Sequence, residues 1–454
     1  MDAAEFQTLA AANISADPQY RLHQTMKDAI EKLKDKSANE YIIDVHGHCF
    51  TLKHVPKKFV GPSFLQYPGV VWTLEKILRF ASFLTMIIRG RGSNYYKAFA
   101  RRRFITVFTN EKEQTDVLQL HWGNFNYYFT KLAKKEKAPH LMICELMMDM
   151  ERGIGGGTDE SFYQQVEGMD RMRNHSRNAA MIVPFFACDP RNPTLFEDFL
   201  AAFTDTDKRV NRTDHQYFDT MSPFFGVKIY PTLGYLPSHP KLMQIFKVCA
   251  EKNIPVTTHC GGASTKFEGH KVQGDYFQWD ENARQLIPMH FDLNFRDYRR
   301  SQRDIQVVKF FNSPKNWIPV METYPKLKVN LAHMGSSDEW YDYRRGVADT
   351  HVHESLYMVE KYANIYLDIS YSFSNNANLK KMYEIMTTNN YSTAATTAYR
   401  NKIMYGTDFY MTQNEKHLAT LVKNLFAQFK DNTEALNRLC IHNPLAFLTN
   451  KTNN

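Results

Sequence analysis

The stretch YIIDVHGH at residues 41–48 is an apolar, β-branched run that stops at polar residues. On a β-strand, residues i, i+2 and i+4 share a face, so Asp44, His46 and His48 point the same way. Two imidazoles at one strand end can reach a single metal ion, and neutral imidazole is a common ligand of zinc and related ions. Gly47 between them allows close backbone approach. The stretch therefore predicts a buried strand that delivers metal ligands.

The same pattern recurs seven times. Short apolar runs that end at polar residues are typical of strands buried on both faces of a parallel sheet. The further runs are His140–Asp149, Met181–Asp189, Phe224–Tyr230, Ile254–Cys260, Leu327–His333, Ile365–Ser370 and Lys402–Asp408. Helix-like segments separate several of them, at residues 240–253, 354–364 and 417–431. Repeated strand–helix alternation predicts a (β/α)8 TIM barrel.

The expected barrel covers residues 41–447, between a polar, helical N-terminal extension at residues 1–40 and a tail at residues 448–454. Connections in β/α units are normally short. Two here are long, at about residues 49–139 and 261–326. We interpret both as insertions at the C-terminal face of the barrel, where catalysis takes place in this fold.

Other predicted strands end at residues that complete a site. His259 ends the fifth run, His333 ends the sixth, and Asp408 ends the eighth. A single histidine at a strand end is more often a hydrogen-bonded structural residue than a ligand. Three strands that offer imidazoles and a fourth that offers a carboxylate indicate a shared site, because all strand ends of a closed barrel meet at one mouth.

Lys228 lies within the fourth run, and a buried lysine is costly unless it is paired or modified. As a carbamate formed with carbon dioxide, it is an anionic bridge between two metal ions. Unmodified, it can hold an anionic substrate group. The structural alternative is an ion pair with a carboxylate such as Glu145, at the end of the second run. The sequence leaves the carbamate and the ion pair open.

Composition excludes some classes of protein. The net charge is +8, and the basic residues are scattered along the chain except for one cluster at residues 97–103, so no nucleic-acid partner is expected. The apolar stretch at residues 70–89 carries charges in its first half, which argues against a membrane-spanning helix. Residues 70–103 stay a candidate contact with a membrane surface or a protein, and a homo-oligomer stays open.

The chain has no signal-peptide pattern and no C-x-x-C pair among its six cysteines, so a cytoplasmic protein with reduced thiols is expected.

Three further residues are candidates for substrate binding. Tyr230 shares a strand face with the buried lysine, and Trp340 and Arg344 follow the sixth run. The alternative for the latter two is ordinary helix packing. His351 and His353 form a second H-x-H pair in a polar, helix-like stretch, and we interpret both as surface residues.

Taken in order, these stretches resemble the amidohydrolase superfamily and, within it, the amidohydrolase-related branch. That branch includes aminocarboxymuconate-semialdehyde decarboxylase, resorcylate-type decarboxylases and lactone hydrolases. The matching stretches are residues 42–48, 181–193, 226–262, 328–340, 364–372 and 403–411, with residues 436–448 similar to the closing helix of the family.

The resemblance implies a divalent metal cofactor, above all Zn²⁺, as one or two ions. It implies that His46 and His48 bind metal from the first strand and His259 from the fifth. Asp408 would contact the metal and its water, and His333 would bind a second metal or polarise the substrate. The lysine of the fourth run falls where some superfamily members carry a carbamylated lysine.

The leading functional hypothesis is hydrolysis of an amide, lactone or ester in a small, anionic substrate, with Asp408 as the base that takes the proton of the attacking water. The second hypothesis is non-oxidative decarboxylation in the same site. The third is a catalytically silent barrel that serves as a binding or scaffold protein.

Overall fold

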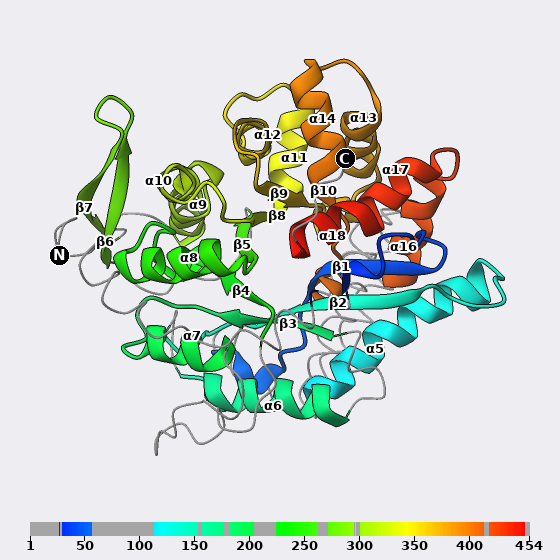
Figure 1. Ribbon diagram of the computed structural model, residues 1–454, viewed down its shortest axis with the longest axis horizontal. Helices are drawn as coiled ribbons and strands as arrows, with labels where there is room; N and C mark the ends of the chain where they lie inside the picture. The colour runs from blue at the N-terminus through cyan, green and yellow to red at the C-terminus, as the bar shows by residue number, and fades with distance from the viewer. Residues whose placement is uncertain are drawn as a thin grey trace, which may run out of the picture.

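A ring of strands lies at the centre of the molecule and helices surround it (Figure 1). The computed structural model describes residues 27, 30–56, 113–152, 157–175, 182–203, 224–261, 271–294, 296, 300–412 and 417–449. Most of the predicted N-terminal extension and the whole of residues 70–103 lie outside these ranges.

Eight parallel strands form one sheet in the order β1-β2-β3-β4-β5-β8-β9-β10. Their bounds are β1 Tyr41–Gly47, β2 His140–Leu146, β3 Ile182–Ala187, β4 Gly226–Ile229, β5 Val256–Gly261, β8 Val329–Gly335, β9 Ile365–Asp368 and β10 Ile403–Met404. All eight predicted strands are confirmed. Backbone hydrogen bonds from Val45 N–H to the Tyr405 carbonyl (3.1 Å) and from Asp408 N–H to the His46 carbonyl (2.8 Å) close the ring between the last strand and the first. The predicted (β/α)8 barrel is therefore confirmed.

Helices follow the strands and cover the outside of the ring (Figure 1). They are α5 Gln114–Tyr127, α6 Phe162–His175, α7 Leu195–Phe203, α8 Pro240–Lys252, α11 Ser336–Arg344, α12 His351–Lys361, α13 Asn376–Thr387, α14 Thr393–Lys402, α15 Phe409–Thr412, α16 Leu418–Gln428, α17 Thr433–Asn437 and α18 Asn443–Leu448. Short 3-10 or π segments are η1 Leu52–His54, η3 Tyr128–Leu132, η7 Pro231–Leu233, η9 Ser372–Ser374 and η10 Arg438–His442. None of the helices in the described ranges is both long and apolar enough to cross a membrane.

Helix α8 shows how the sequence sets the bounds of these elements. The side chain of His239 accepts a hydrogen bond from the Lys241 N–H at its start, and Pro240 occupies the first turn, where its missing N–H costs nothing. Asn253 ends the helix in the left-handed conformation, at φ 57°. The buried positions recur every three or four residues, so one face packs on the barrel.

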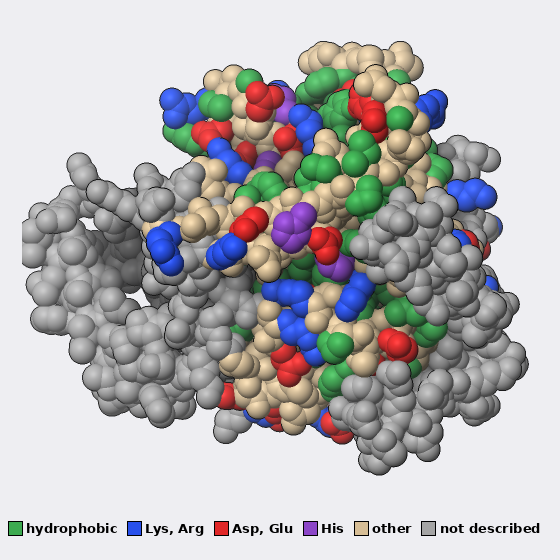
Figure 2. Space-filling model, turned by 90° about the vertical axis from the view of Figure 1, so that its left-hand side faces the viewer, with side chains coloured by type: hydrophobic (Ala, Val, Ile, Leu, Met, Phe, Trp, Pro, Cys, Tyr) green, Lys and Arg blue, Asp and Glu red, His purple; other side chains and the backbone are tan. Residues whose placement is uncertain are grey.

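The long connection between β5 and β8 contains structure of its own. It comprises the antiparallel hairpin of β6 (Lys271–Asp280) and β7 (Gln285–Asn294), then α9 (Arg300–Phe311), η8 (Pro314–Trp317) and α10 (Ile318–Thr323). In Figure 1 the hairpin projects beside α8 and α9. Figure 2 looks onto that side of the molecule, where acidic, basic and histidine side chains are interspersed.

Two expectations about individual side chains are tested directly. All six cysteines are buried and free, in keeping with reduced thiols. The prediction that His351 is a surface residue is wrong, whereas His353 is exposed as expected. His351 begins α12, where its backbone N–H donates to Glu339 of α11 and its side chain contacts the backbone of Lys309 in α9, so packing between helices buries it.

Candidate metal centre

His46 in β1 and His48, which directly follows this strand, bring their Nε2 atoms within 3.1 Å of each other. His48 Nδ1 lies 2.7 Å from the Leu146 carbonyl, which only accepts, so this nitrogen carries the proton. His46 Nδ1 lies 3.1 Å from a carboxylate oxygen of Asp368, which favours a proton there too. Both Nε2 lone pairs then face each other, an arrangement that a shared cation stabilises. Two ligands at about 2.05 Å from a tetrahedral zinc ion lie about 3.3 Å apart, so the donor set fits such an ion.

Asp408 completes the first candidate group. Its Oδ1 lies 3.7 Å from His48 Nε2, and ligand atoms of His46, His48 and Asp408 all lie within 4.8 Å of one another. Burial lowers the pKa of His48 well below its usual value, helped by the charges of His46 and Lys228. Burial likewise raises the pKa of Asp408 to about 6. The group therefore combines two imidazoles, of which burial favours the neutral form of His48, with a carboxylate whose pKa burial raises to about 6.

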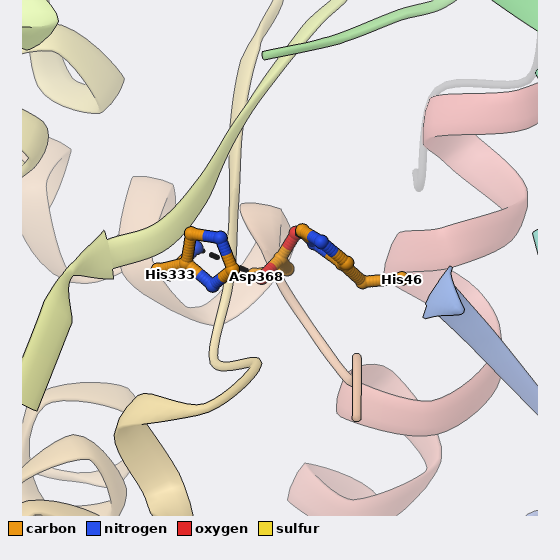
Figure 3. Close-up of side chains that lie close together, drawn as sticks. All are labelled: His46, His333 and Asp368. Carbon is orange, nitrogen blue, oxygen red and sulfur yellow. Dashed lines mark hydrogen bonds and ion pairs between the residues drawn. The ribbon is translucent and has the colours of Figure 1, made fainter. Parts of the chain in front are cut away.

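Asp368, from the end of β9, lies between the imidazoles of His46 and His333 (Figure 3). Its carboxylate accepts hydrogen bonds from the Asn330 side chain (2.7 Å), the His333 N–H (3.0 Å) and the Ser370 N–H (3.1 Å), as well as from the Ser370 hydroxyl. Burial alone would raise its pKa, but His46, His333 and Ser370 outweigh burial and hold it well below the usual range. Because its oxygens already accept several hydrogen bonds, this carboxylate is better suited to orienting histidine ligands than to binding a metal directly.

His333 connects this group to β5. Its Nε2 lies 2.9 Å from His259 Nδ1, and the His333 ring centroid lies 4.6 Å from those of both His46 and His259. Burial lowers the pKa of His333 well below its usual value, with a further contribution from His46. The structure thus brings together the four histidines that the sequence predicts at strand ends.

The backbone at two of these positions is left-handed. His333 has φ 66° and begins four successive residues with positive φ, and Asp408 has φ 51°. Such conformations cost about 1–3 kcal/mol each for residues with a Cβ and cluster at functional sites. His333 lies two residues before the end of β8 and Asp408 four residues after the end of β10, so both occur where barrel strands end.

Asp44 stabilises the end of β1, the strand that carries His46. Its Oδ1 accepts hydrogen bonds from the His46 N–H (3.0 Å) and the Thr407 N–H (2.9 Å), and its Oδ2 accepts from the Thr407 hydroxyl (2.5 Å). The carboxylate thereby ties β1 to the turn that carries Asp408.

Lys228 is buried, and its Nζ has no hydrogen-bond partner among the described residues. Burial lowers its pKa to about 8, although the charges of Asp368 and Asp408 oppose this shift. The alternative of an ion pair with Glu145 is wrong. In the register of the sheet, Glu145 pairs with Pro184 and Lys228 with Ala187, three residues further along β3, so the two side chains point to opposite faces. Glu145 instead contacts the thiol of Cys49.

The three candidates for substrate binding lie in different surroundings. The ring of Tyr230 meets that of His259 edge-on, with centroids 4.8 Å apart. Trp340 is fully buried and packs against Tyr343, whereas Arg344 is exposed, with its guanidinium 6.0 Å from the Tyr341 ring. The structure thus places Tyr230 beside the histidines, and the roles of the other two stay predictions.

Sequence reasoning missed the residues that orient the histidines, namely Asp368, Ser370 and Asn330. The hydroxyl of Ser370 lies 2.9 Å from His333 Nδ1 and 3.2 Å from His46 Nδ1. A carboxylate inside the apolar run at residues 365–370 was the available signal, because a buried aspartate needs partners.

The chain was compared with known proteins. A family model described as Amidohydrolase matches residues 222–449, and no curated protein matches. Three solved structures are similar at the level of the fold. A 5-carboxyvanillate decarboxylase from Novosphingobium aromaticivorans, complexed with manganese, is 10% identical with a TM-score of 0.43, over 92% of this chain and 97% of that one. An amidohydrolase from Mycobacterium avium subsp. paratuberculosis is 12% identical with a TM-score of 0.40, over 90% of this chain and 99% of that one. The Metarhizium anisopliae IDCase is 12% identical with a TM-score of 0.39, over 90% of this chain and 97% of that one. By its match to the family model, which spans half of its length, the chain belongs to the amidohydrolase family.

Proposed function

We propose that this chain is a metal-dependent hydrolase that cleaves a C–N or C–O bond of an amide, lactone or ester in a small anionic substrate. The observation that carries the proposal is the convergence of the His46 and His48 Nε2 atoms beside Asp408. Two imidazole nitrogens and a carboxylate with a pKa of about 6 offer both a cation site and a proton acceptor.

The residues that would hold the metal follow from the donor set. His46, His48 and Asp408 would bind one divalent cation, for which Zn²⁺ suits the mixed nitrogen and oxygen ligands. A second ion would take His259 and His333, with Lys228 as a carbamate. When bound, the metal supplies Lewis acidity, lowering the pKa of water from about 15.7 to about 7 and polarising a carbonyl.

Asp408 is the proposed base. Its carboxylate accepts the proton of the attacking water and later donates it to the leaving nitrogen or oxygen, which requires a pKa near the working pH. In the metal-free protein, burial raises this pKa to about 6. His333, which lies between His46 and His259, would stabilise the negative charge that develops on the carbonyl oxygen.

An anionic substrate suits the charge at the mouth of the barrel. If Lys228 is not carbamylated, its unpartnered Nζ is a buried cation that a substrate carboxylate would neutralise. The half-buried ring of Tyr230 would form a wall of the same site, next to His259.

Metal analysis and product analysis test this function together. The purified protein is analysed for bound divalent metals and then assayed with a panel of lactones, esters, amides and aromatic acids. Ring opening or release of an alcohol or amine supports hydrolysis. Release of carbon dioxide instead would assign non-oxidative decarboxylation, the second hypothesis from the sequence. A protein that binds no metal after careful preparation would contradict the enzyme proposal and favour a binding or scaffold protein.

A further inference from the structure

Asn312 joins two loops at the mouth of the barrel. It directly follows α9, in the connection between β5 and β8, and its side chain is buried. Its Nδ2 donates a hydrogen bond of 2.8 Å to the carbonyl of Gly261, the last residue of β5. Its Oδ1 accepts one of 2.8 Å from the hydroxyl of Thr232, in the turn η7 after β4. One amide therefore joins the C-terminal ends of two neighbouring barrel strands.

Both partners of Asn312 lie close to candidate site residues. Thr232 follows Tyr230 by two residues, and Gly261 follows His259 by two residues. A Cβ at Gly261 would lie only 3.1 Å from the His333 ring. Since Gly261 is in such close contact with His333, a shift of this segment would reach the imidazoles directly.

The rest of the same connection packs on the loop after β4. Leu236 of that loop shares a small hydrophobic core with Phe291 of β7 and with Val307 and Phe311 of α9. The backbone N–H of Phe277 in β6 donates to the Ser238 carbonyl at 3.0 Å. The β5–β8 connection thus holds the loop by apolar packing, and the side chain of Asn312 links the connection to β5 as well.

We propose that Asn312 is a positioning residue, through which the β5–β8 connection fixes the segments that carry Tyr230 and His259. Its predicted effect on metal binding rests on the proposed function, whereas its effect on the two segments does not. Removal of the amide leaves a buried carbonyl and a buried hydroxyl without their partner, so both segments would open more often.

Amide hydrogen exchange of the metal-free protein tests the positioning role. Asn312→Ala should speed exchange about tenfold in residues 231–236 and 257–261, the effect of losing a buried hydrogen bond. Thr232→Val removes a single hydroxyl without a change of shape and should affect residues 231–236 alone. The matched control is Asn316→Ala, because Asn316 donates to the carbonyls of Phe310 (2.6 Å) and Phe311 (3.2 Å) within the same connection. Its effect should stay within residues 310–316.

Unchanged exchange at both segments in Asn312→Ala would overturn the proposal, and if that variant does not fold, unchanged exchange in Thr232→Val would overturn it. Zinc affinity, measured by chelator competition, tests the link to the site: we expect it to fall about tenfold in Asn312→Ala and to stay unchanged in Asn316→Ala. Faster exchange with unchanged affinity would refute that link. A wild-type protein that binds no metal would refute the proposed function, while the exchange data would still decide the role of Asn312.

Discussion

Replacement of Asp368 by asparagine is the sharpest test of how the histidines are held. The carboxylate is fully buried, and each of its oxygens meets donors. Oδ2 lies near Asn330 Nδ2 (2.7 Å) and His46 Nδ1 (3.1 Å), and Oδ1 accepts from the backbone N–H groups of His333 and Ser370. An asparagine amide of the same shape turns one oxygen into a donor, so at least two donors lose their acceptor whichever way the amide is oriented.

The magnitude follows from these contacts. Each buried donor left without an acceptor costs about 1–3 kcal/mol, so the free energy of unfolding should fall by a few kcal/mol. Loss of the carboxylate also removes the preference for a proton on His46 Nδ1, and with it the lone pair at Nε2 that faces His48. Loss of such an orienting partner weakens metal binding about 10- to 100-fold, or about 1.4–2.8 kcal/mol.

Zinc affinity by chelator competition and unfolding by urea should be measured on the same preparations. The matched control is Asp198→Asn, since Asp198 is also a buried carboxylate and accepts from Tyr163 (2.6 Å), Asn192 (2.9 Å) and Thr194 (2.9 Å), outside the candidate site. All three donors meet Oδ2, so an asparagine with its oxygen at that position keeps these contacts, and we expect the control to lose little stability and to keep its zinc affinity. Zinc affinity of Asp368→Asn within about twofold of the wild-type value would refute the orienting role.

Three further substitutions test the site and its surroundings. Asp408→Asn should leave metal bound but lower turnover at least ~100-fold, the scale of a lost general base, and retained turnover would exclude that role. Burial lowers the pKa of Lys228 to about 8, so the buried charge destabilises the metal-free fold below that pH, and this penalty disappears as the pH rises towards about 10.5. Lys228→Met should therefore raise the free energy of unfolding at pH 7 by up to about 3 kcal/mol and raise it much less at pH 10, whereas an equal gain at both would contradict the buried cation. A Cβ at Gly47 would lie 2.5 Å from the Ile143 side chain, so Gly47→Ala should destabilise the protein by about 1–3 kcal/mol in thermal unfolding. An unchanged melting temperature would show that β2 shifts to accommodate the added methyl group without cost.

The sequence predicted the barrel because its signal is repeated. Eight apolar runs that each end at polar residues leave few alternatives, and the strands end where the side chains change character. The same reasoning predicted the four histidines of the site, because a residue at the end of a barrel strand has its side chain at the mouth of the barrel. These are His46, His48, His259 and His333.

The features that the sequence did not predict depend on the register of the strands and on hydrogen-bond partners that are distant in the chain. The side chains of Glu145 and Lys228 point to opposite faces, and this follows from pairings through β3 that no local pattern specifies. Asp368 and Ser370 owe their role to hydrogen bonds with histidines more than 30 residues away in sequence. The burial of His351 likewise depends on packing against a helix that is distant in sequence, since its side chain contacts the backbone of Lys309 in α9. Such long-range contacts decide the details of the site.

The closure of the barrel between β10 and β1 has a consequence for synthesis of the protein. Asp44 and Thr407, whose side chains join the two ends of the ring, lie 363 residues apart in the chain. A nascent chain still lacking residues 403–408 has neither the last strand nor the Asp408 carboxylate, so it cannot complete the ring or the candidate group of His46, His48 and Asp408. Domains fold as units during translation, and contacts between residues this distant in sequence form only once both are available. Binding of the metal would therefore report that the ribosome has finished the barrel, and truncated products would be distinguishable by their failure to retain the ion.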